Sequence, residues 1–506
     1  MIHPLKKYPW YVLLLPLFFV WHGYAEYFRY LHTSDALKLS FSYTAFSLCV
    51  FGISWIFFRN IRKAGLMTGI WMAVYLFFGA IHDFLKAYSP FNFIHRYRYL
   101  GPVLIVLLIF AFIYMKKTRH SLYRITLFLN VLFCIYLLID VFIILSKAFR
   151  TDKNNSLYQF TVPEFTAVPD ELNKPDIYFL LFDEYASSVA LEQQYGFKND
   201  IDSFFEAEGF SVQPGSVSNY NYTPFSIASL LNMSYIQGIK SDHGVDRTDF
   251  LECNPAILNN QVMLFLKEKG YNIVNFSMFD VADQPSRIKQ SFLPLKTKMI
   301  VEGTLFPRLY RDFDSLFINN AVLAKMIGGD NIFEHLTNNE FSLNGVEQAS
   351  KEKQPDPRFI YGHFYMPHEP FFFDEHGNRK DNAMILAEDN GLSPEPYLQY
   401  LKYTNTRIRE LISKIKANTN GQAAIVVLSD HGYRDYASIG DPKSHFRNLN
   451  AVYLPDKNYN GMYDSISNVN QFRVILNTLF QQQLPLLKDS TIFLLDRKFM
   501  AAPKSK

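Results

Sequence analysis

The sequence predicts a helical membrane domain followed by an α/β domain whose mostly parallel sheet is covered by helices on both faces. Three observations lead to this prediction. Long apolar runs gather in the first 150 residues. From about residue 175 onward, short apolar runs typical of buried strands alternate with helical patterns. Two of these short runs end abruptly in acidic residues, as strands do at the functional edge of an open α/β sheet.

Five apolar runs in residues 1–150 each approach the ~20 residues that a membrane-spanning helix requires, so a transmembrane domain of five helices is predicted. The runs cover approximately Trp10–Tyr24, Leu39–Phe58, Leu66–Phe84, Leu100–Met115 and Leu122–Leu145. The first run could instead be an uncleaved signal segment, although no small-residue cleavage site follows it. Near the end of the third run, His82 and Asp83 are expected to face lipid headgroups rather than to line a pathway.

Basic residues between the predicted spans are unevenly distributed between the two sides of the membrane. One side carries Lys6, Lys7, Arg59, Arg62, Lys63, Lys116, Lys117, Arg119 and Arg124, and the other carries Arg29, Lys86, Arg96 and Arg98. Because basic residues favour the cytoplasmic side, the N-terminus is expected in the cytoplasm. An odd number of spans then places everything after about residue 150 outside the cytoplasm.

Cysteine usage and net charge exclude some function classes. Cys49 and Cys134 lie in predicted spans and Cys253 is alone outside them, so no disulfide is expected within the C-terminal domain. The formal net charge is only +3, and the sequence has neither a basic run nor a zinc-finger spacing. We therefore expect no binding to nucleic acid. No feature of the sequence indicates an obligate protein partner.

Residues 151–174 are polar and contain two prolines, which predicts a linker or a segment that follows the surface. The second domain is then expected over residues 175–506. Its strands are expected at 177–182, 272–276, 359–364, 423–428 and 451–454, and its helices at 188–208, 223–233, 260–269, 397–415 and 470–482. Residues 286–344 lack this alternation and are expected to form helical insertions.

Two predicted strands end in carboxylates. The run 423–428 is followed by Ser429-Asp430-His431-Gly432, and the run 177–182 by Asp183-Glu184. If these strands are neighbours in a parallel sheet, Asp183 and the Asp430-His431 pair come within metal-bridging distance. Two simpler interpretations stay open at this point, namely a strand end with an ordinary glycine turn and a pair of helix-capping carboxylates.

Thr223 lies at the start of a predicted helix, directly before Pro224. A threonine in this position is typical of an N-cap with proline at the first helical position. A helix N-terminus also binds phosphate or sulfate through its free N–H groups. A hydroxyl at such a place, with its pKa lowered by a metal, could attack a phosphorus centre.

The predicted strand 359–364 runs into a loop in which prolines bracket His368. A rigid loop at the end of a strand can present an imidazole to an oxyanion or a leaving group. His363 alternates along the strand and is expected to be a hydrogen-bonded core histidine.

The order Asp183, Thr223, His368 and Asp430-His431, each on its expected element, resembles the alkaline phosphatase superfamily. Within it, the chain is similar to the sulfatase-like branch that includes lipoteichoic acid synthases and phosphoethanolamine transferases. Those proteins share five amino-terminal spans and an extracytoplasmic catalytic domain. The resemblance covers about residues 175–495, and it implies a bacterial cytoplasmic membrane protein whose catalytic domain lies on the extracytoplasmic face.

The resemblance implies one divalent metal ion, Mn²⁺ or Zn²⁺, because three oxygens and one imidazole suit both. Carried over by position, its ligands are Asp183, the threonine nucleophile Thr223, Asp430 and His431. Glu184 is the alternative or additional acidic ligand. His368 resembles the histidine that contacts the transferred group.

Two departures narrow the resemblance. True sulfatases of this superfamily carry a C/S-x-P-x-R motif, and the segment Cys253–Ile257 has the proline but lacks the arginine. Two-metal relatives place an Asp-x-x-x-His shortly before the Asp-His-Gly motif, whereas this chain has no histidine between His376 and His431. A formylglycine nucleophile and a second metal are therefore not expected.

After Gly432, several cationic or donor side chains precede the last predicted strand: Tyr433, Arg434, Lys443, His445 and Arg447. Some of them could bind the phosphate of a substrate, although a solvated loop would look the same. We select His445 and Arg447 as substrate-binding residues because they lie nearest to the strand.

The expected function is metal-dependent transfer or hydrolysis of a phosphoester by a membrane-anchored enzyme with a threonine nucleophile. A phosphoglycerol or phosphoethanolamine type of group would pass from a membrane lipid or lipid-linked substrate to an envelope glycan or lipid acceptor. Two alternatives stay open: a sulfuric-ester or phosphate-ester hydrolase that uses water as acceptor, and a catalytically inactive membrane-anchored binding protein.

Overall fold

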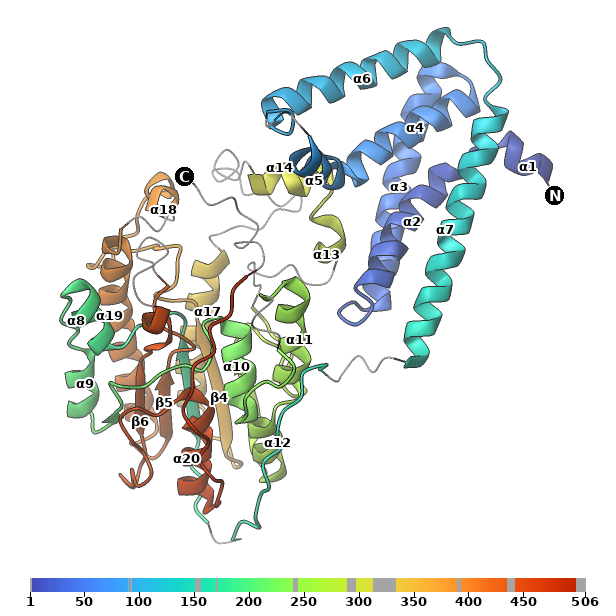
Figure 1. The fold of residues 1–506 in the computed structure, drawn as a ribbon. Helices are drawn as coiled ribbons and strands as arrows, with labels where there is room; N and C mark the ends of the chain where they lie inside the picture. Colours follow the sequence, from blue (N-terminus) through green and yellow to red (C-terminus); the bar gives the residue numbers. More distant parts are fainter. Residues whose placement is uncertain are drawn as a thin grey trace. The chain divides into compact units, whose positions relative to one another are not determined.

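The computed structural model describes residues 2–89, 91, 93–150, 156–169, 172–239, 244–288, 297–312, 334–388, 393–434 and 442–496. By its internal contacts the chain divides into two compact units (Figure 1). The first comprises Met1–Lys153 and Ser291–Asn331, and the second comprises Asn154–Gln290 and Ile332–Lys506. We describe each unit by itself.

The first unit is helical. Its helices are α1 (Ile2–Lys7), α2 (Tyr11–Glu26), α3 (Thr33–Phe58), α4 (Ile61–Leu76), α5 (Phe78–Tyr88), α6 (Tyr97–Lys117), α7 (Tyr123–Arg150), α13 (Lys298–Val301) and α14 (Leu305–Asp312). Among the described residues, α3, α6 and α7 are long and apolar enough to cross a membrane. Helices α4 and α5 form a fourth candidate span if their pair, bent by 63°, is counted as one. Helix α2 has only 16 residues, so the count of five spans stays a prediction.

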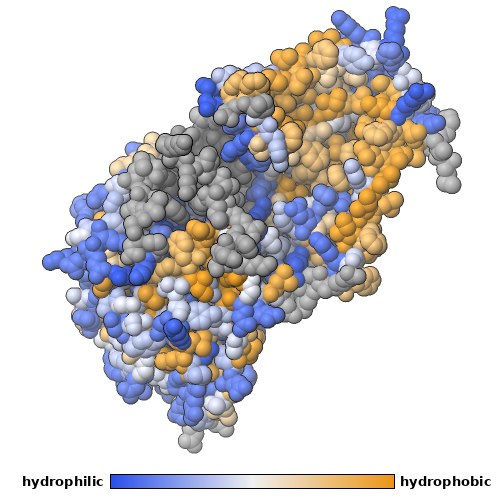
Figure 2. Space-filling view, in the orientation of Figure 1, coloured by the Kyte–Doolittle hydropathy of each residue, from blue (hydrophilic) through white to orange (hydrophobic). Residues whose placement is uncertain are grey.

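The surface of this unit is strongly apolar. Large side chains on α3, α6 and α7 are exposed, including Phe41, Phe110 and Phe142, and Figure 2 shows hydrophobic residues covering this part of the molecule. Exposed apolar area of this extent is not stable in water and is typical of helices that lie in lipid.

Two contacts join sequence-distant parts of this first unit. The side chain of Asn130 on α7 accepts a hydrogen bond from the Tyr11 N–H and donates to the carbonyls of Leu5 and Tyr8. Residues 297–312, part of the predicted insertions, pack against the bent pair α4 and α5. There Arg308 forms an ion pair with Asp83, with a nitrogen to oxygen distance of 2.7 Å.

The second unit contains one six-stranded sheet with the order β2-β6-β5-β1-β4-β3. The strands are β1 (Ile177–Phe182), β2 (Ser211–Val212), β3 (Asn272–Phe276), β4 (Arg358–Phe364), β5 (Ala424–Leu428) and β6 (Asn450–Tyr453). Strands β5, β1, β4 and β3 are parallel, and β6 is antiparallel to both of its neighbours. The predicted mostly parallel sheet is therefore confirmed.

Helices cover both faces of this sheet (Figure 1). They are α8 (Ser188–Tyr195), α9 (Ile201–Ala207), α10 (Thr223–Asn232), α11 (Arg247–Leu258), α12 (Gln261–Glu268), α17 (Glu334–Lys351), α18 (Asn382–Glu388), α19 (Glu395–Asn418) and α20 (Asn468–Phe480). Every residue of β1 is buried, as a strand covered on both faces requires. Tyr178 and Leu180 join the core with Leu401 of α19, whereas Phe179 points to the other face and packs edge-on against Phe472 of α20.

The strand register brings the functional edge together. Leu181 of β1 is level with Leu428 of β5 on one side and with His363 of β4 on the other. Because these three strands are parallel, the residues that follow them all emerge at the same edge of the sheet. The residues of the predicted linker from 156 to 169 follow the surface of this second unit, where Tyr158 donates to Asp249 and the Thr166 N–H to Gln482.

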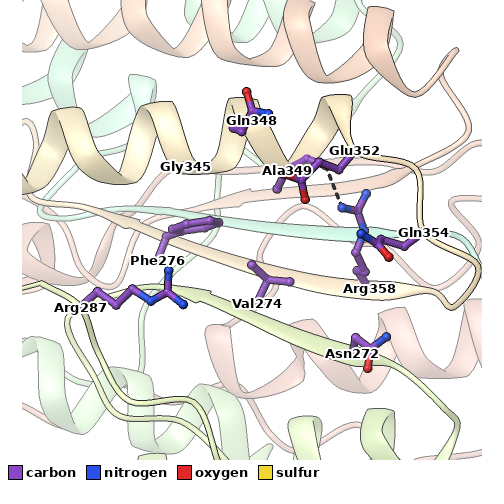
Figure 3. Close-up of a pocket in the computed structure, with 10 residues that line it drawn as sticks. All are labelled: Asn272, Val274, Phe276, Arg287, Gly345, Gln348, Ala349, Glu352, Gln354 and Arg358. Carbon is purple, nitrogen blue, oxygen red and sulfur yellow. Dashed lines mark hydrogen bonds between the residues drawn. The ribbon is translucent and has the colours of Figure 1, made fainter.

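A pocket of about 400 Å³ lies between α17 and strands β3 and β4 (Figure 3). Arg358, the first residue of β4, lines it and donates a hydrogen bond to the Ala349 carbonyl. The pocket runs along β3 from Asn272 to Phe276, and none of the residues that line it belongs to the predicted site.

The contact between Gly79 and Gly303 predicts a stability effect. The Gly79 N–H donates to the Gly303 carbonyl, and a Cβ at Gly79 would lie 2.6 Å from that oxygen. Gly79→Ala should therefore cost about 1–3 kcal/mol, because backbone atoms must move apart. Gly52→Ala is the matched control, since a Cβ there meets nothing within 4 Å. Thermal unfolding of the full-length protein in detergent should show a lower Tm for Gly79→Ala alone; equal Tm values would contradict this contact.

Candidate active site

Two acidic residues from neighbouring strands meet at the carboxyl edge of the sheet. Asp183 directly follows β1, and its N–H donates to the Phe364 carbonyl at the end of β4. Asp430 and His431 follow β5, the other neighbour of β1. The structure places one ligand atom each of Asp183, Asp430 and His431 within 4.8 Å of one another, and all three residues are buried. The adjacency of the two strands, which the sequence could only suggest, brings this group together.

The environment of this buried group suits a cation. Among the described residues, Asp183 Oδ1 and Asp430 Oδ2 have no hydrogen-bond partner, although neither atom is exposed to water. Burial and the neighbouring Asp430 carboxylate raise the pKa of Asp183 well above its usual range. Buried carboxylates are stable in ionised form only when a positive charge compensates them. A divalent ion between these oxygens satisfies that requirement, so the residues present fit a metal.

His431 is in the tautomer that a metal ligand needs. Its Nδ1 lies 2.9 Å from the Gly432 carbonyl and donates to it, which leaves the lone pair on Nε2. That Nε2 lies 3.2 Å from Asp430 Oδ2 and 3.9 Å from Asp183 Oδ1. Burial, followed by the charge of Arg434, lowers the pKa of His431 well below its usual range, so the imidazole is neutral.

Thr223 adds a hydroxyl to the group. Tyr222, without a side-chain hydrogen bond to the helix, occupies the N-cap position of α10, and Thr223 is the first helical residue. The simpler interpretation of Thr223 as the N-cap is therefore wrong. Its Oγ1 lies 3.4 Å from His431 Nε2, and the residue is only 7% exposed. Thr223 thus lies in the first turn of α10, and the positive end of the helix dipole favours an anion there.

Hydrogen bonds from two helices fix the Ser429–Gly432 turn. Ser226 on α10 donates to the Asp430 carbonyl at 2.5 Å, so the helix that carries Thr223 is tied directly to this turn. Asn468 on α20 donates to the same carbonyl at 3.3 Å. The Gly432 N–H donates to the His445 carbonyl, and a Cβ at Gly432 would lie 2.4 Å from the Ser444 carbonyl oxygen. Only glycine permits this close approach.

The backbones of His445 and Arg447 lie next to this turn. Their side chains contact residues outside the group of Asp183, Asp430 and His431. The Arg447 guanidinium bonds to Gln193 on α8, and the His445 ring packs near Phe493. Their predicted role in substrate binding stays a prediction. Residues 435–441, which connect the turn to this segment, lie outside the described residues.

His368 contacts the site at the side chain of Glu184. The structure records cis peptide bonds before Pro367 and Pro370 on either side of His368. The Nδ1 of His368 donates to the Glu369 carbonyl at 2.7 Å, and its Nε2 lies 3.4 Å from Glu184 Oε2. Burial opposes protonation, but the charges of Glu184 and Asp183 outweigh it and raise the pKa of His368.

Two residues that the sequence analysis did not select also lie here. His363 is buried, as expected for a core histidine, but its Nε2 faces Asp183 Oδ2 at 3.4 Å. Burial lowers the pKa of His363 to about 4, so it is neutral. Arg434 contacts both Glu184 and His368. The alternation of side chains along β4 already indicated that His363 points to one face of the sheet. Nothing in the sequence distinguished Arg434 from the other cationic residues that follow Gly432.

Comparison with known protein families decides the classification. Residues 218–474, just over half of the chain, match the family described as Sulfatase. This chain belongs to the sulfatase family. The match confirms the resemblance to the sulfatase-like branch of the alkaline phosphatase superfamily and the prediction that the chain is an enzyme. No curated protein matches the chain.

Solved structures with a similar fold include transferases and hydrolases. The zinc complex of the C-terminal periplasmic domain of EcEptC from Escherichia coli is 11% identical with a TM-score of 0.39, covering 66% of this chain and 94% of that one. The corresponding domain of the phosphoethanolamine transferase EptC from Campylobacter jejuni is 15% identical (TM-score 0.35; 63% and 92%). The phosphonate monoester hydrolase of Agrobacterium radiobacter is 12% identical (TM-score 0.39; 62% and 74%). Because all three TM-scores lie below 0.5, we infer the site from its own residues.

The group of Asp183, Asp430 and His431 predicts how much metal the protein binds. Metal analysis of the full-length protein purified in detergent should find about one equivalent per chain, and Asp430→Ala should lose it because a ligand is removed. Asp176→Asn is the matched control, since Asp176 pairs with Arg358 at the amino ends of the strands. A wild type without metal, or full metal content in Asp430→Ala, would contradict the proposed centre.

Proposed function

We propose that this sulfatase-family enzyme transfers or hydrolyses phosphoesters with Thr223 as its nucleophile. The observation that carries the proposal is the position of the Thr223 hydroxyl. It belongs to the first residue of α10 and not to the N-cap, lies 3.4 Å from His431 Nε2, and neighbours two buried carboxylates that could hold a cation. A serine or threonine hydroxyl becomes nucleophilic when its pKa is lowered in such surroundings.

A single divalent ion, Mn²⁺ or Zn²⁺, would be held by Asp183, Thr223, Asp430 and His431; when bound, it would lower the pKa of the Thr223 hydroxyl and offset negative charge on the transferred group. The neutral Nε2 of His431 and the unsatisfied carboxylate oxygens support this assignment. The chain's own residues then do the rest of the chemistry.

In the first step, the Thr223 hydroxyl releases its proton to solvent and its oxygen forms a bond to phosphorus, while the bond between phosphorus and the leaving oxygen breaks. The N–H groups at the start of α10 face the negative oxygens of the phosphoryl group. His368, within its proline-bracketed loop, assists the departure of the leaving oxygen by supplying a proton. In the second step, the oxygen of water or of an alcohol attacks phosphorus and passes its proton to His368, while the bond between phosphorus and Thr223 Oγ breaks and Thr223 takes up a proton from solvent.

The N-terminal unit supports a lipid-linked substrate. Its long apolar helices anchor the catalytic unit to a membrane, which keeps the site close to membrane lipids. We propose a phosphoglycerol or phosphoethanolamine type of headgroup as the donated group and an envelope glycan or lipid as the acceptor. The catalytic unit then lies on the extracytoplasmic face of the cytoplasmic membrane of a bacterium.

A second candidate is a sulfuric-ester or phosphate-ester hydrolase with water as acceptor, which the match to the sulfatase family favours. The surroundings of Cys253 argue against its conversion to a formylglycine nucleophile like that of true sulfatases. Cys253 is fully buried within α11, and burial raises the pKa of its thiol. A catalytically inactive binding protein would have no chemical need for the buried acidic group.

The nucleophile can be tested by mass spectrometry of the full-length protein isolated from its native host. We expect a phosphoryl-containing adduct on Thr223, whose mass identifies the transferred group. Thr223→Ala should lose the adduct and lower kcat by a factor of at least about 10³. Thr223→Ser should still form the adduct and remain active, because it retains the hydroxyl. An active enzyme that never carries the adduct, or an active Thr223→Ala variant, would remove Thr223 as the nucleophile.

A further inference from the structure

We infer that Glu184 is a positioning residue rather than a metal ligand, and that it holds Arg434 where the guanidinium binds an anionic oxygen of the substrate's phosphoryl or sulfuryl group. The inference rests on the proposed function, because it places this oxyanion beside Thr223. It also answers the question that the sequence left open for the two adjacent acidic residues, Asp183 and Glu184.

The side chain of Glu184 is committed to Arg434. Its Oε1 accepts two hydrogen bonds, from the Arg434 backbone N–H at 2.9 Å and from Nε at 3.0 Å. Its Oε2 faces His368 Nε2 at 3.4 Å. Both side chains of the ion pair are nearly buried, with 5% of Glu184 and 11% of Arg434 exposed. A buried, multiply hydrogen-bonded ion pair of this kind is costly to break.

The backbone of Glu184 serves the metal group instead. Glu184 has a φ of 62°, which is rare for a residue with a side chain and favours glycine. In this conformation its N–H donates to Asp430 Oδ1 at 3.1 Å, and its carbonyl accepts from the Tyr397 hydroxyl at 2.9 Å. The strained backbone thus orients Asp430 while the Glu184 carboxylate points to Arg434.

Charge balance agrees with this division of roles. The carboxylates of Asp183 and Asp430 together neutralise one divalent ion, and Glu184 neutralises Arg434. If Glu184 bound the metal instead, the ion would carry an excess of negative ligands and the largely buried Arg434 would lose this carboxylate partner. The group of potential ligand atoms within 4.8 Å accordingly contains Asp183, Asp430 and His431.

Arg434 is placed to meet the anion that Thr223 attacks. Its Nη2 lies 3.1 Å from His368 Nε2, and its guanidinium lies 5.4 Å from the ring centroid of Tyr222. Tyr222 directly precedes Thr223, so Arg434 lies between the proposed proton donor and the nucleophile's helix. A guanidinium is planar with several fixed donors, which suits the oxygens of a tetrahedral phosphate or sulfate ester.

The test uses full-length, metal-loaded protein in detergent and inorganic phosphate as the probe. Arg434→Met and Glu184→Gln should each keep about one metal equivalent and weaken phosphate binding by at least about tenfold, measured by titration calorimetry. The double variant should be no weaker than Arg434→Met alone, because Glu184 acts through Arg434. Arg434→Lys should recover only part of the affinity, because an ammonium group cannot make both sets of contacts.

Arg358→Met is the control, since it breaks the buried Arg358–Asp176 pair at the other ends of the strands. It should lower the Tm without changing phosphate affinity. Loss of metal in Glu184→Gln would make Glu184 a ligand and overturn the inference, as would unchanged phosphate affinity in Arg434→Met. If Thr223 carries no adduct while phosphate binding still depends on Arg434, the proposed function fails and the oxyanion site stands.

Discussion

The site depends on one electrostatic constraint: two carboxylates, Asp183 and Asp430, are buried side by side at the ends of neighbouring strands. Two ionised carboxylates in this arrangement are strongly unfavourable without a cation, because each charge lacks water and repels the other. A divalent ion would offset both charges. Such an ion would also explain two neighbouring groups. The neutral His431 keeps the lone pair of its Nε2, and the Thr223 hydroxyl lies next to that nitrogen.

The surrounding structure keeps the carboxylates in position. Strands β1 and β5 pair in parallel register, so the residues after them emerge together. Ser226 and Asn468 donate to the Asp430 carbonyl from two helices, and Gly432 packs closely against the carbonyls of Ser444 and Arg447. Because Ser226 belongs to the helix that begins with Thr223, this hydrogen bond links the helix of the proposed nucleophile directly to the Ser429–Gly432 turn.

Much of this was predictable from the sequence, for physical reasons. Buried strands are continuous apolar runs, and their abrupt ends at Asp183 and Asp430 mark the functional edge of the sheet. The order of the strands was not predictable, since it depends on long-range pairing. The contacts of single side chains were not predictable either. Alternation predicts the face of the sheet to which His363 points, but not that it faces Asp183, and no local pattern predicts that Glu184 pairs with Arg434. Likewise, no pattern in residues 297–312 indicated that they pack with the N-terminal helices.

We propose that one metal ion lies between Asp183 and Asp430, next to Thr223. The most direct measurement is anomalous scattering at the zinc and manganese edges from crystals of the full-length protein prepared without chelator. We predict a single peak within about 2.0–2.3 Å of ligand atoms of Asp183, Thr223, Asp430 and His431, and none bound by Glu184. The absence of a peak, or a peak whose ligands exclude the two aspartates, would contradict the account.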